Sequence, residues 1–372
     1  MRNRYIKLAI LMVFVTLAFT GCWDSVSIEK KDITTAVLVD KTDNGYAFYI
    51  EIASIAGSST GEEAQQTPRS KMLVGEGETF VDAREELERK SDKPVSLFGV
   101  QCVIFTEKFA YSGIEEYMYR FRQNPEYRKT ALAVVTRENP EDLFGAASEN
   151  NTLIGLTVND TLQSQVDTGY LYPFTMGDLL TVLACPYKGY LLPCVDLDNN
   201  KEPMLDGFCV MDGSNCLGYI PIEDSESIVY IRNNMSPFHY ALPYAENNIT
   251  LELHLKKSGT DVSYNDGQIQ ICLHFTCKAN LLYMSDNLTV DEAVRQKITD
   301  ELKNKLTEEY KKVIETSQKI FKCDYLKFHE SFRIKYPEQY KDMDWSEEYQ
   351  KATITVDFSV EVVGGNIDYE PK

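Results

Sequence analysis

Cys22 is the residue whose surroundings in the sequence best suit a defined chemical reaction. It follows Leu8 to Phe19, a run of about 12 apolar or small residues, and that run follows a short basic segment with Arg2, Arg4 and Lys7. A basic head before an apolar run of this length is typical of a secretory signal peptide. The run is also shorter than the roughly 20 residues that a membrane-spanning helix needs. The sequence therefore predicts that the chain is exported.

The residues up to Cys22, Phe19-Thr20-Gly21-Cys22, resemble the lipobox at which bacterial lipoprotein signals are cleaved, although an aliphatic residue is usual where Phe19 stands. The small Gly21 gives the peptidase access, and the adjacent thiol is the only strong nucleophile there. We expect Cys22 to become the first mature residue and to carry a diacylglyceryl group and an N-acyl chain such as palmitate. Two acyl chains anchor a protein stably, whereas one does so only marginally. The alternative is a buried or disulfide-bonded cysteine that happens to follow a signal peptide.

The other residue types that often carry chemistry form no recognised site. The remaining cysteines show no C-x-x-C pairing of the kind that binds zinc, and no histidine belongs to an H-E-x-x-H motif. No G-x-S-x-G motif, P-loop or dinucleotide fingerprint is present. We therefore expect no catalytic, metal or cofactor site and mostly small core cysteines, with their disulfide state left open. These residues are Cys102, Cys185, Cys194, Cys209, Cys216, Cys272, Cys277 and Cys323, with His239, His254, His274 and His329.

The composition indicates an acidic globular protein. Of the 372 residues, 43% are hydrophobic and 26% are charged, and the formal net charge is −19. A chain of this length can form two or three domains, each with its own core. Because the charge is strongly negative and no basic block offsets it, phosphates would repel the chain, which argues against a nucleic-acid partner. Anionic lipid headgroups would repel it too.

The first half of the chain alternates strand and helix patterns. Two runs of β-branched and aromatic residues, Ile33 to Asp40 and Tyr46 to Ile55, flank Asp43-Asn44-Gly45 and predict a β-hairpin. The alternation that follows predicts a mixed or partly parallel sheet with helices packed on it. The expected segments are a loop at 58–71 and strands at 100–106 and 130–136. Helices are expected at 79–89, from the end of the 100–106 strand to about 122, at 140–147 and at 175–184.

The second half is rich in strand patterns and contains one long helix pattern. Asp196 to Pro203 is polar and turn-rich, and is the predicted linker. Thr289 and Glu292 form a capping-box pattern before an apolar stripe that predicts a helix to near Phe321. The stripe could form a partner-binding face, but we favour packing across the sheet of its own domain. The expected strands are 207–211, 216–222, 227–231, 249–256, 268–276 and 352–362.

Together these elements predict a multi-domain fold between α/β and α+β, with mixed β-sheets and packed helices. A long helix is expected before the last strand of the C-terminal domain. The expected divisions are a signal peptide at 1–21, a mixed α/β region at 22–200 that can hold two subdomains, and an α+β domain at 201–372.

Short motifs follow one another in order over nearly the whole chain. In the first half they are Gly21-Cys22-Trp23-Asp24, Ile28-Glu29, Val39-Asp40-Lys41, Gly77, Thr79, Ala83, Leu97-Phe98, Val103 to Phe105, Gly113-Ile114, Arg122 and Arg128. In the second half they are Gly207 to Val210, Leu217-Gly218-Tyr219, and the tract from Gln318 to Gly364 with Asp324, Phe328, Pro337, Trp345 and Tyr349. Together they resemble the Ger(x)C family of spore-germination lipoproteins. Ser25 to Ser27 in place of charged residues, and Tyr340 in place of Trp, indicate a divergent member.

The resemblance implies a fold of three domains, which would subdivide the two regions given above, and a function without catalysis. It implies the C subunit of a nutrient germinant receptor, anchored by lipid at Cys22 on the outer face of the spore inner membrane. Such a subunit is required for receptor assembly or signalling, together with membrane-embedded subunits of the A and B types. No catalytic residues are implied.

Two other classes of function remain as alternatives. A solute-binding lipoprotein, which delivers a small ligand to a membrane transporter, would favour two similar doubly wound lobes, whereas the two halves here differ in pattern. An exported, lipid-anchored hydrolase is disfavoured because histidines are few and no nucleophile motif is present.

Overall fold

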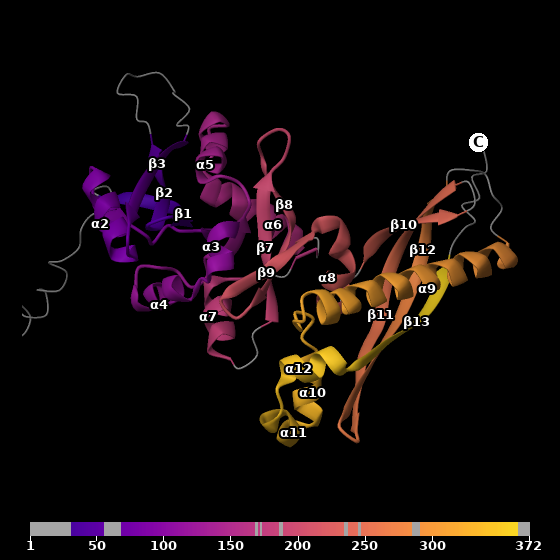
Figure 1. The fold of residues 1–372 in the computed structure, drawn as a ribbon. Helices are drawn as coiled ribbons and strands as arrows, with labels where there is room; N and C mark the ends of the chain where they lie inside the picture. Colours follow the sequence, from indigo (N-terminus) through magenta and orange to yellow (C-terminus); the bar gives the residue numbers. More distant parts are fainter. Residues whose placement is uncertain are drawn as a thin grey trace, which may run out of the picture.

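The computed structural model describes two β-sheets that lie side by side, each with helices packed against it (Figure 1). The described residues are 31–55, 68–167, 170–171, 173–185, 189–233, 237–244, 247–284 and 291–363. Cys22 and the expected signal peptide lie outside these residues. Among the described helices, none is long and apolar enough to cross a membrane.

The first sheet has nine strands in the order β3-β2-β1-β5-β6-β7-β8-β9, and the short β4 pairs with the start of β1. Its centre, from β1 through β5 and β6 to β7, is parallel, and the strands that flank this centre pair antiparallel. The expected hairpin, β1 with β2, and the expected mixed sheet are confirmed. The strands are β1 (Asp32–Thr42), β2 (Gly45–Ile55), β3 (Pro68–Gly77), β4 (Val95–Ser96), β5 (Cys102–Thr106), β6 (Leu132–Thr136), β7 (Gly189–Leu197), β8 (Pro203–Asp212) and β9 (Asn215–Pro221).

Helices cover both faces of the first sheet, so its central strands are buried on both sides. Side chains of α2, α3, α4 and α7 join the buried cluster on one face, and those of α5 and α6 join the cluster on the other. Consecutive residues of β1 alternate between the clusters, with Val37 and Val39 on the first face and Ala36 and Leu38 on the second. The helices are α2 (Phe80–Lys90), α3 (Glu107–Ser112), α4 (Glu115–Gln123), α5 (Pro140–Glu149), α6 (Ile154–Asp167) and α7 (Met176–Ala184).

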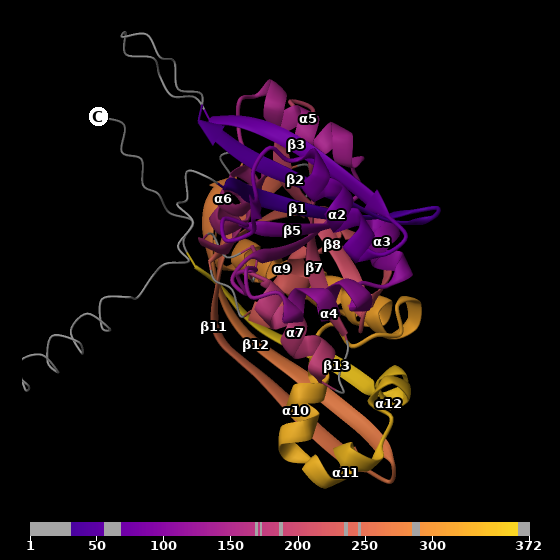
Figure 2. The ribbon, with the colours of Figure 1, turned by 90° about the vertical axis from the view of Figure 1, so that its left-hand side faces the viewer.

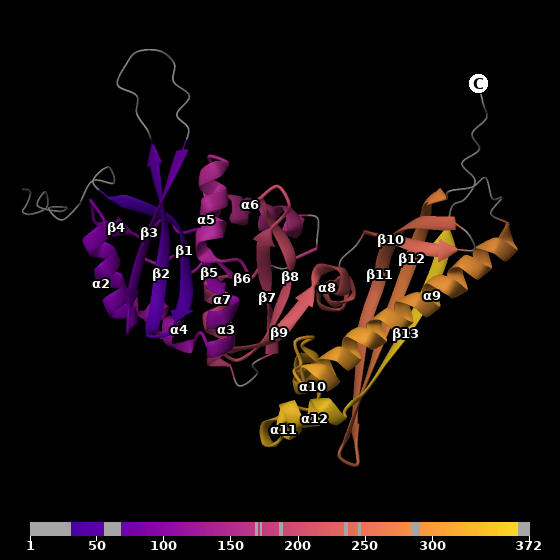
Figure 3. The ribbon, with the colours of Figure 1, turned by 45° about the horizontal axis from the view of Figure 1, so that its top comes forward.

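The second sheet has four strands in the order β10-β11-β12-β13, and helix α9 runs across one of its faces (Figure 3). The long β11–β12 hairpin extends to α10 and α11 (Figure 2), where the ring centroids of Tyr264 and Phe332 are 5.7 Å apart. The elements are α8 (Glu226–Asn233), β10 (Phe238–Tyr244), β11 (Asn247–Asn265), β12 (Gln268–Met284), α9 (Glu292–Glu315), α10 (Phe328–Lys335), α11 (Pro337–Asp342), α12 (Trp345–Lys351) and β13 (Thr353–Val363). A π-helical turn, Thr316–Ile320, extends α9.

The apolar stripe of α9 packs on the sheet of its own half. Ile298 and Leu302 are buried, and the ring centroid of Tyr310 lies 5.2 Å from that of Phe275 on β12 and 4.9 Å from that of Phe358 on β13. The favoured interpretation of the stripe is therefore confirmed, as is the long helix before the last strand.

The prediction of a linker at Asp196 to Pro203 is wrong, because this segment is the turn of the β7–β8 hairpin. The carboxylate of Asp198 accepts hydrogen bonds from the backbone N–H groups of Asn200 and Glu202, both at 2.8 Å. A tight turn needs the same polar residues as a linker, so composition alone does not distinguish them. The boundary expected at residues 200/201 falls inside this hairpin, and the first sheet draws strands from both sides of it.

The strand expected at residues 227–231 is a helix, α8. The carbonyl of Ser225 accepts hydrogen bonds from the N–H groups of Ile228 at 3.0 Å and Val229 at 3.1 Å, which start the helix. β-branched residues favour strands, but here burial of Ile228 and Val229 against the core outweighs that preference.

Other elements begin elsewhere than expected or have no predicted counterpart. Asp291 caps α9, because its carboxylate accepts a hydrogen bond from the N–H of Val294 at 2.8 Å; the predicted cap, Thr289, lies outside the described residues. Two observed elements, the strand β3 and the helix α6, were not predicted from the sequence.

A buried carboxylate, Glu51, joins three strands of the first sheet to α6. Its side chain is 0% exposed and accepts hydrogen bonds from the hydroxyls of Thr35 at 2.6 Å and Ser70 at 3.0 Å. It also accepts from the N–H groups of Ile154 at 2.7 Å and Gly155 at 3.0 Å, the first residues of α6. A negative charge at a helix N-terminus is stabilising, and buried donors need partners. Glu51 therefore fixes where α6 meets the sheet.

A second buried carboxylate, Asp324, joins the segment after α9 to α10 and α12. It is 4% exposed and accepts hydrogen bonds from the N–H groups of Phe328 at 3.0 Å and His329 at 2.8 Å, and from the indole N–H of Trp345 at 2.9 Å. Because all three donors are buried, removing their acceptor leaves each one unpaired.

We predict that Glu51→Gln destabilises the protein by about 2 kcal/mol, because the amide has one acceptor oxygen where the carboxylate has two. Chemical denaturation monitored by circular dichroism measures the change. The exposed Glu85→Gln on α2 is the matched control and should change stability by less than about 0.5 kcal/mol. Equal stabilities of the two variants would contradict the assigned role of Glu51.

We predict that Asp324→Asn lowers the free energy of unfolding by about 2–3 kcal/mol. Trp345→Phe removes only one of the three donors and keeps an aromatic ring, so it should lower the free energy of unfolding by less than Asp324→Asn does. Denaturant midpoints of both variants provide the measurement, with the exposed Asp342→Asn on α11 as the control. If Asp324→Asn were as stable as Asp342→Asn, the three hydrogen bonds would not hold this region together.

Candidate functional site

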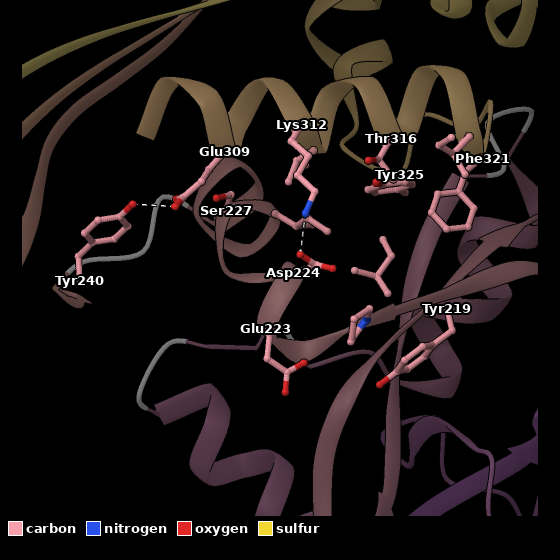
Figure 4. A pocket seen from close by; sticks show the side chains of 15 residues that line it. Tyr219, Glu223, Asp224, Ser227, Tyr240, Glu309, Lys312, Thr316, Phe321 and Tyr325 are labelled. Atoms are coloured by element: carbon pink, nitrogen blue, oxygen red, sulfur yellow. Dashed lines mark hydrogen bonds and ion pairs between the residues drawn. The ribbon is translucent and has the colours of Figure 1, made fainter. Parts of the chain in front are cut away.

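A cavity of about 390 Å³ lies where the first sheet meets α9 (Figure 4). One wall comes from the edge strand β9 and the 3-10 turn Ile222–Asp224 that follows it, and the opposite wall comes from the C-terminal half of α9 and the residues after it. α8 and β10 complete the lining. Junctions between structural units are common places for ligand sites, so we treat this cavity as the candidate site.

The two walls approach closely because β9 has a glycine where they meet. A Cβ atom built at Gly218 would lie 2.7 Å from Cε1 of Phe321, which is closer than carbon atoms pack. Gly218 thus lets the Phe321 ring, which lines the cavity, rest on the strand.

Tyr219 lines the cavity and is held in place by a charged network beneath it. Its hydroxyl donates to the backbone carbonyl of Asp206 at 2.6 Å and to the Asp206 carboxylate. The guanidinium of Arg137 lies 4.1 Å from the ring centroid and pairs with Asp196 at 2.8 Å and with Asp206. Burial and the Asp206 carboxylate raise the pKa of Tyr219 above its usual value, so the phenol stays protonated.

The polar groups of the lining are mostly acidic. Lys312 on α9 reaches Asp224 on the opposite wall, with a distance of 3.0 Å between nitrogen and oxygen, and Glu309 accepts a hydrogen bond of 2.7 Å from the hydroxyl of Tyr240 (Figure 4). Glu223 adds a third carboxylate. The described lining residues therefore supply three carboxylates and one ammonium group.

The remaining lining is apolar or aromatic, apart from the hydroxyls of Ser227, Thr316 and the tyrosines. Among the lining residues that the structure describes, none is a histidine or a cysteine.

The histidines singled out in the sequence are not among the described residues that line this cavity, and His239 on β10 pairs across the sheet with Glu252 on β11. His254 on β11 contacts Glu252 at 2.8 Å, His274 on β12 contacts Asp261 at 3.2 Å, and His329 is buried beside Asp324. Within the described part of the chain, no group of three or more His, Cys, Asp or Glu side chains is arranged to hold a metal ion.

The eight cysteines after Cys22 are free thiols in the structure, and most are buried. Cys277 is buried and Cys272 is partly exposed, as expected for positions on opposite faces of β12. Burial raises the pKa of the Cys102 and Cys323 thiols, which keeps both protonated.

Sequence patterns did not indicate the cavity, because its polar residues belong to no motif. Two of the short motifs nevertheless meet there: Leu217-Gly218-Tyr219 on β9, and the tract that starts at Gln318 and supplies Phe321 and Tyr325. Some other motif residues serve the architecture. For example, a Cβ atom at Gly77 would lie 2.4 Å from the backbone nitrogen of Ala83, so Gly77 allows α2 to pack on β3.

Comparison with known proteins gives one consistent result. The family model "Spore germination protein N-terminal domain" matches residues 24–197, and the model "Spore germination B3/GerAC like, C-terminal" matches residues 206–365. Spore germination protein B3 of Bacillus subtilis (strain 168) is 20% identical over 368 residues, which cover 95% of this chain and 96% of that protein. Spore germination protein KC of the same strain is 22% identical over 377 residues, which cover 92% of this chain and 91% of that protein.

A crystal structure of the GerBC protein has a similar fold. The TM-score is 0.57 at 17% sequence identity, and the match covers 88% of this chain and 97% of that one. This similarity supports the multi-domain mixed α/β fold and confirms the fold class expected from the sequence. Because the two family models together match most of the chain, the resemblance to the Ger(x)C proteins is confirmed, and the chain belongs to this family of spore germination proteins.

Proposed function

We propose that this protein is the lipid-anchored C subunit of a nutrient germinant receptor and acts in receptor assembly or signalling during spore germination. The observation that carries the proposal is the extent of the family match. The N-terminal family model begins at residue 24, two residues after Cys22, and the C-terminal model ends at residue 365. Residues 1–21 thus precede the family domains, as a signal peptide would.

The proposed role is binding rather than catalysis, with membrane-embedded subunits of the A and B types as partners. The match to spore germination proteins supports this view. A solute-binding lipoprotein is less consistent with the architecture, because the nine-stranded mixed sheet and the four-stranded sheet are not two similar lobes. On this proposal the body lies at the outer face of the spore inner membrane.

We predict that Cys22→Ala abolishes lipid attachment and normal processing, because the acylated thiol is required before the signal peptide is removed. Labelling with a radioactive or clickable palmitate, together with the mass of the protein and its distribution between membrane and soluble fractions, measures the effect. The variant should incorporate no label, retain residues 1–21 and fail to restore nutrient-triggered germination to spores that lack the native gene.

Cys185→Ala is the matched control, since Cys185 is an exposed cysteine in the body. It should be labelled, processed and active like the unchanged protein. A Cys22→Ala protein that was processed, membrane-bound and functional would rule out the proposed anchor.

The receptor role has a separate test in co-purification. A C-terminally tagged full chain, extracted from spore membranes in mild detergent, should bring down the membrane-embedded subunits at a fixed ratio. If the protein were recovered alone under conditions that keep those two subunits together, the proposed subunit role would be wrong even if the anchor were correct.

A further inference from the structure

The junction cavity has the size of a small-molecule site. Its volume of about 390 Å³ lies near the lower end of the roughly 300–1,000 Å³ that is usual for ligand pockets, which suits a molecule with one ring and a short chain. Aromatic rings of Tyr219, Phe321 and Tyr325 and aliphatic side chains such as Ile228 and Val313 provide apolar contact surface.

The charge of the lining selects for a cation. Among the lining residues that the structure describes, Lys312 is the only Lys or Arg and already pairs with Asp224, so no described lining residue offsets the charges of Glu223 and Glu309. Arg137, beneath Tyr219, is matched by two carboxylates of its own, Asp196 and Asp206. An anionic ligand would therefore be repelled, and an ammonium group would be attracted.

Tyr325 adds a polar group whose hydrogen-bonding capacity is unused. Its side chain is 0% exposed and lines the cavity, and its buried hydroxyl has no hydrogen-bond partner among the described residues. Burial raises the pKa of Tyr325 above its ordinary value, so the hydroxyl keeps its proton and can donate it to a hydrogen bond. Buried hydroxyls in proteins are normally paired, which makes this group a candidate ligand contact.

We propose that the junction cavity binds a small organic cation: a primary amine on a single-ring apolar body, with a hydrogen-bonding atom at the end away from the amine. The ammonium group lies against the carboxylates of Glu223 and Glu309, the ring lies among the aromatic and aliphatic lining, and the far polar atom bonds to the hydroxyl of Tyr325. In Figure 4, Tyr325 lies on the wall after α9 and Glu223 on the opposite wall, and both line the cavity. This binding does not depend on the proposed receptor role.

Calorimetric titration of the full chain, purified in detergent, with three matched probes tests the proposal. Tyramine has the ring, the ammonium group and a far hydroxyl; phenethylamine lacks the hydroxyl; and 3-(4-hydroxyphenyl)propanoate replaces the ammonium group by a carboxylate. Tyramine should bind about three- to tenfold more tightly than phenethylamine, since one hydrogen bond accounts for such a ratio. The propanoate should bind at least about tenfold more weakly than tyramine.

Variants assign the contacts to individual residues. Tyr325→Phe should remove the difference between tyramine and phenethylamine without lowering the stability of the protein, because the hydroxyl has no partner to lose among the described residues. Glu223→Gln and Glu309→Gln should each weaken both amines. Glu301→Gln, an exposed change on α9 away from the cavity, is the control and should leave all affinities unchanged. Equal affinity for tyramine and the propanoate, or an unchanged ratio of the two amines in Tyr325→Phe, would overturn the proposal.

Discussion

Three hydrogen-bond donors meet at the buried carboxylate of Asp324, two from the backbone at the start of α10 and one from the indole of Trp345. A buried N–H group without an acceptor is costly, so the chain after α9 must adopt the turn that presents these donors to the carboxylate. The same turn carries Phe321 and Tyr325 onto one wall of the junction cavity. The shape of the candidate site thus depends on a residue that does not line it.

The two sheets are joined through one continuous core. Residues of the first sheet such as Leu38 and Val210 belong to the same buried cluster as Leu302 of α9 and Phe358 of β13. α8 lies between the first sheet and α9 (Figure 3), and Gly218 admits the ring of Phe321 at the edge of that sheet. Because this shared core positions both walls, a substitution in either sheet can alter the cavity.

Short patterns in the sequence correctly predicted the elements whose structure depends on only a few neighbouring residues. The Asp-Asn-Gly turn between β1 and β2, the Thr79 cap of α2 and the apolar period of α9 each specify a structure within a few residues. The 196–203 segment and α8 were assigned wrongly because a hairpin turn resembles a linker, and because burial outweighed β propensity in α8. The cavity could not be predicted, since Tyr219, Lys312 and Tyr325 are ordinary residues that only the tertiary fold brings together.

The net charge of −19 explains why a covalent anchor suits this protein, because anionic headgroups would repel the chain and could not hold it. Two acyl chains on Cys22, as proposed, hold a protein whatever its charge. About ten residues, which span at most roughly 35 Å, separate Cys22 from Asp32 at the start of β1. The cavity lies instead beside β9, five strand positions from β1 in the sheet order, or about 24 Å away at the usual spacing. A tether of that length exceeds this width of the sheet, so the proposed anchor by itself leaves the cavity free to face toward the membrane or away from it.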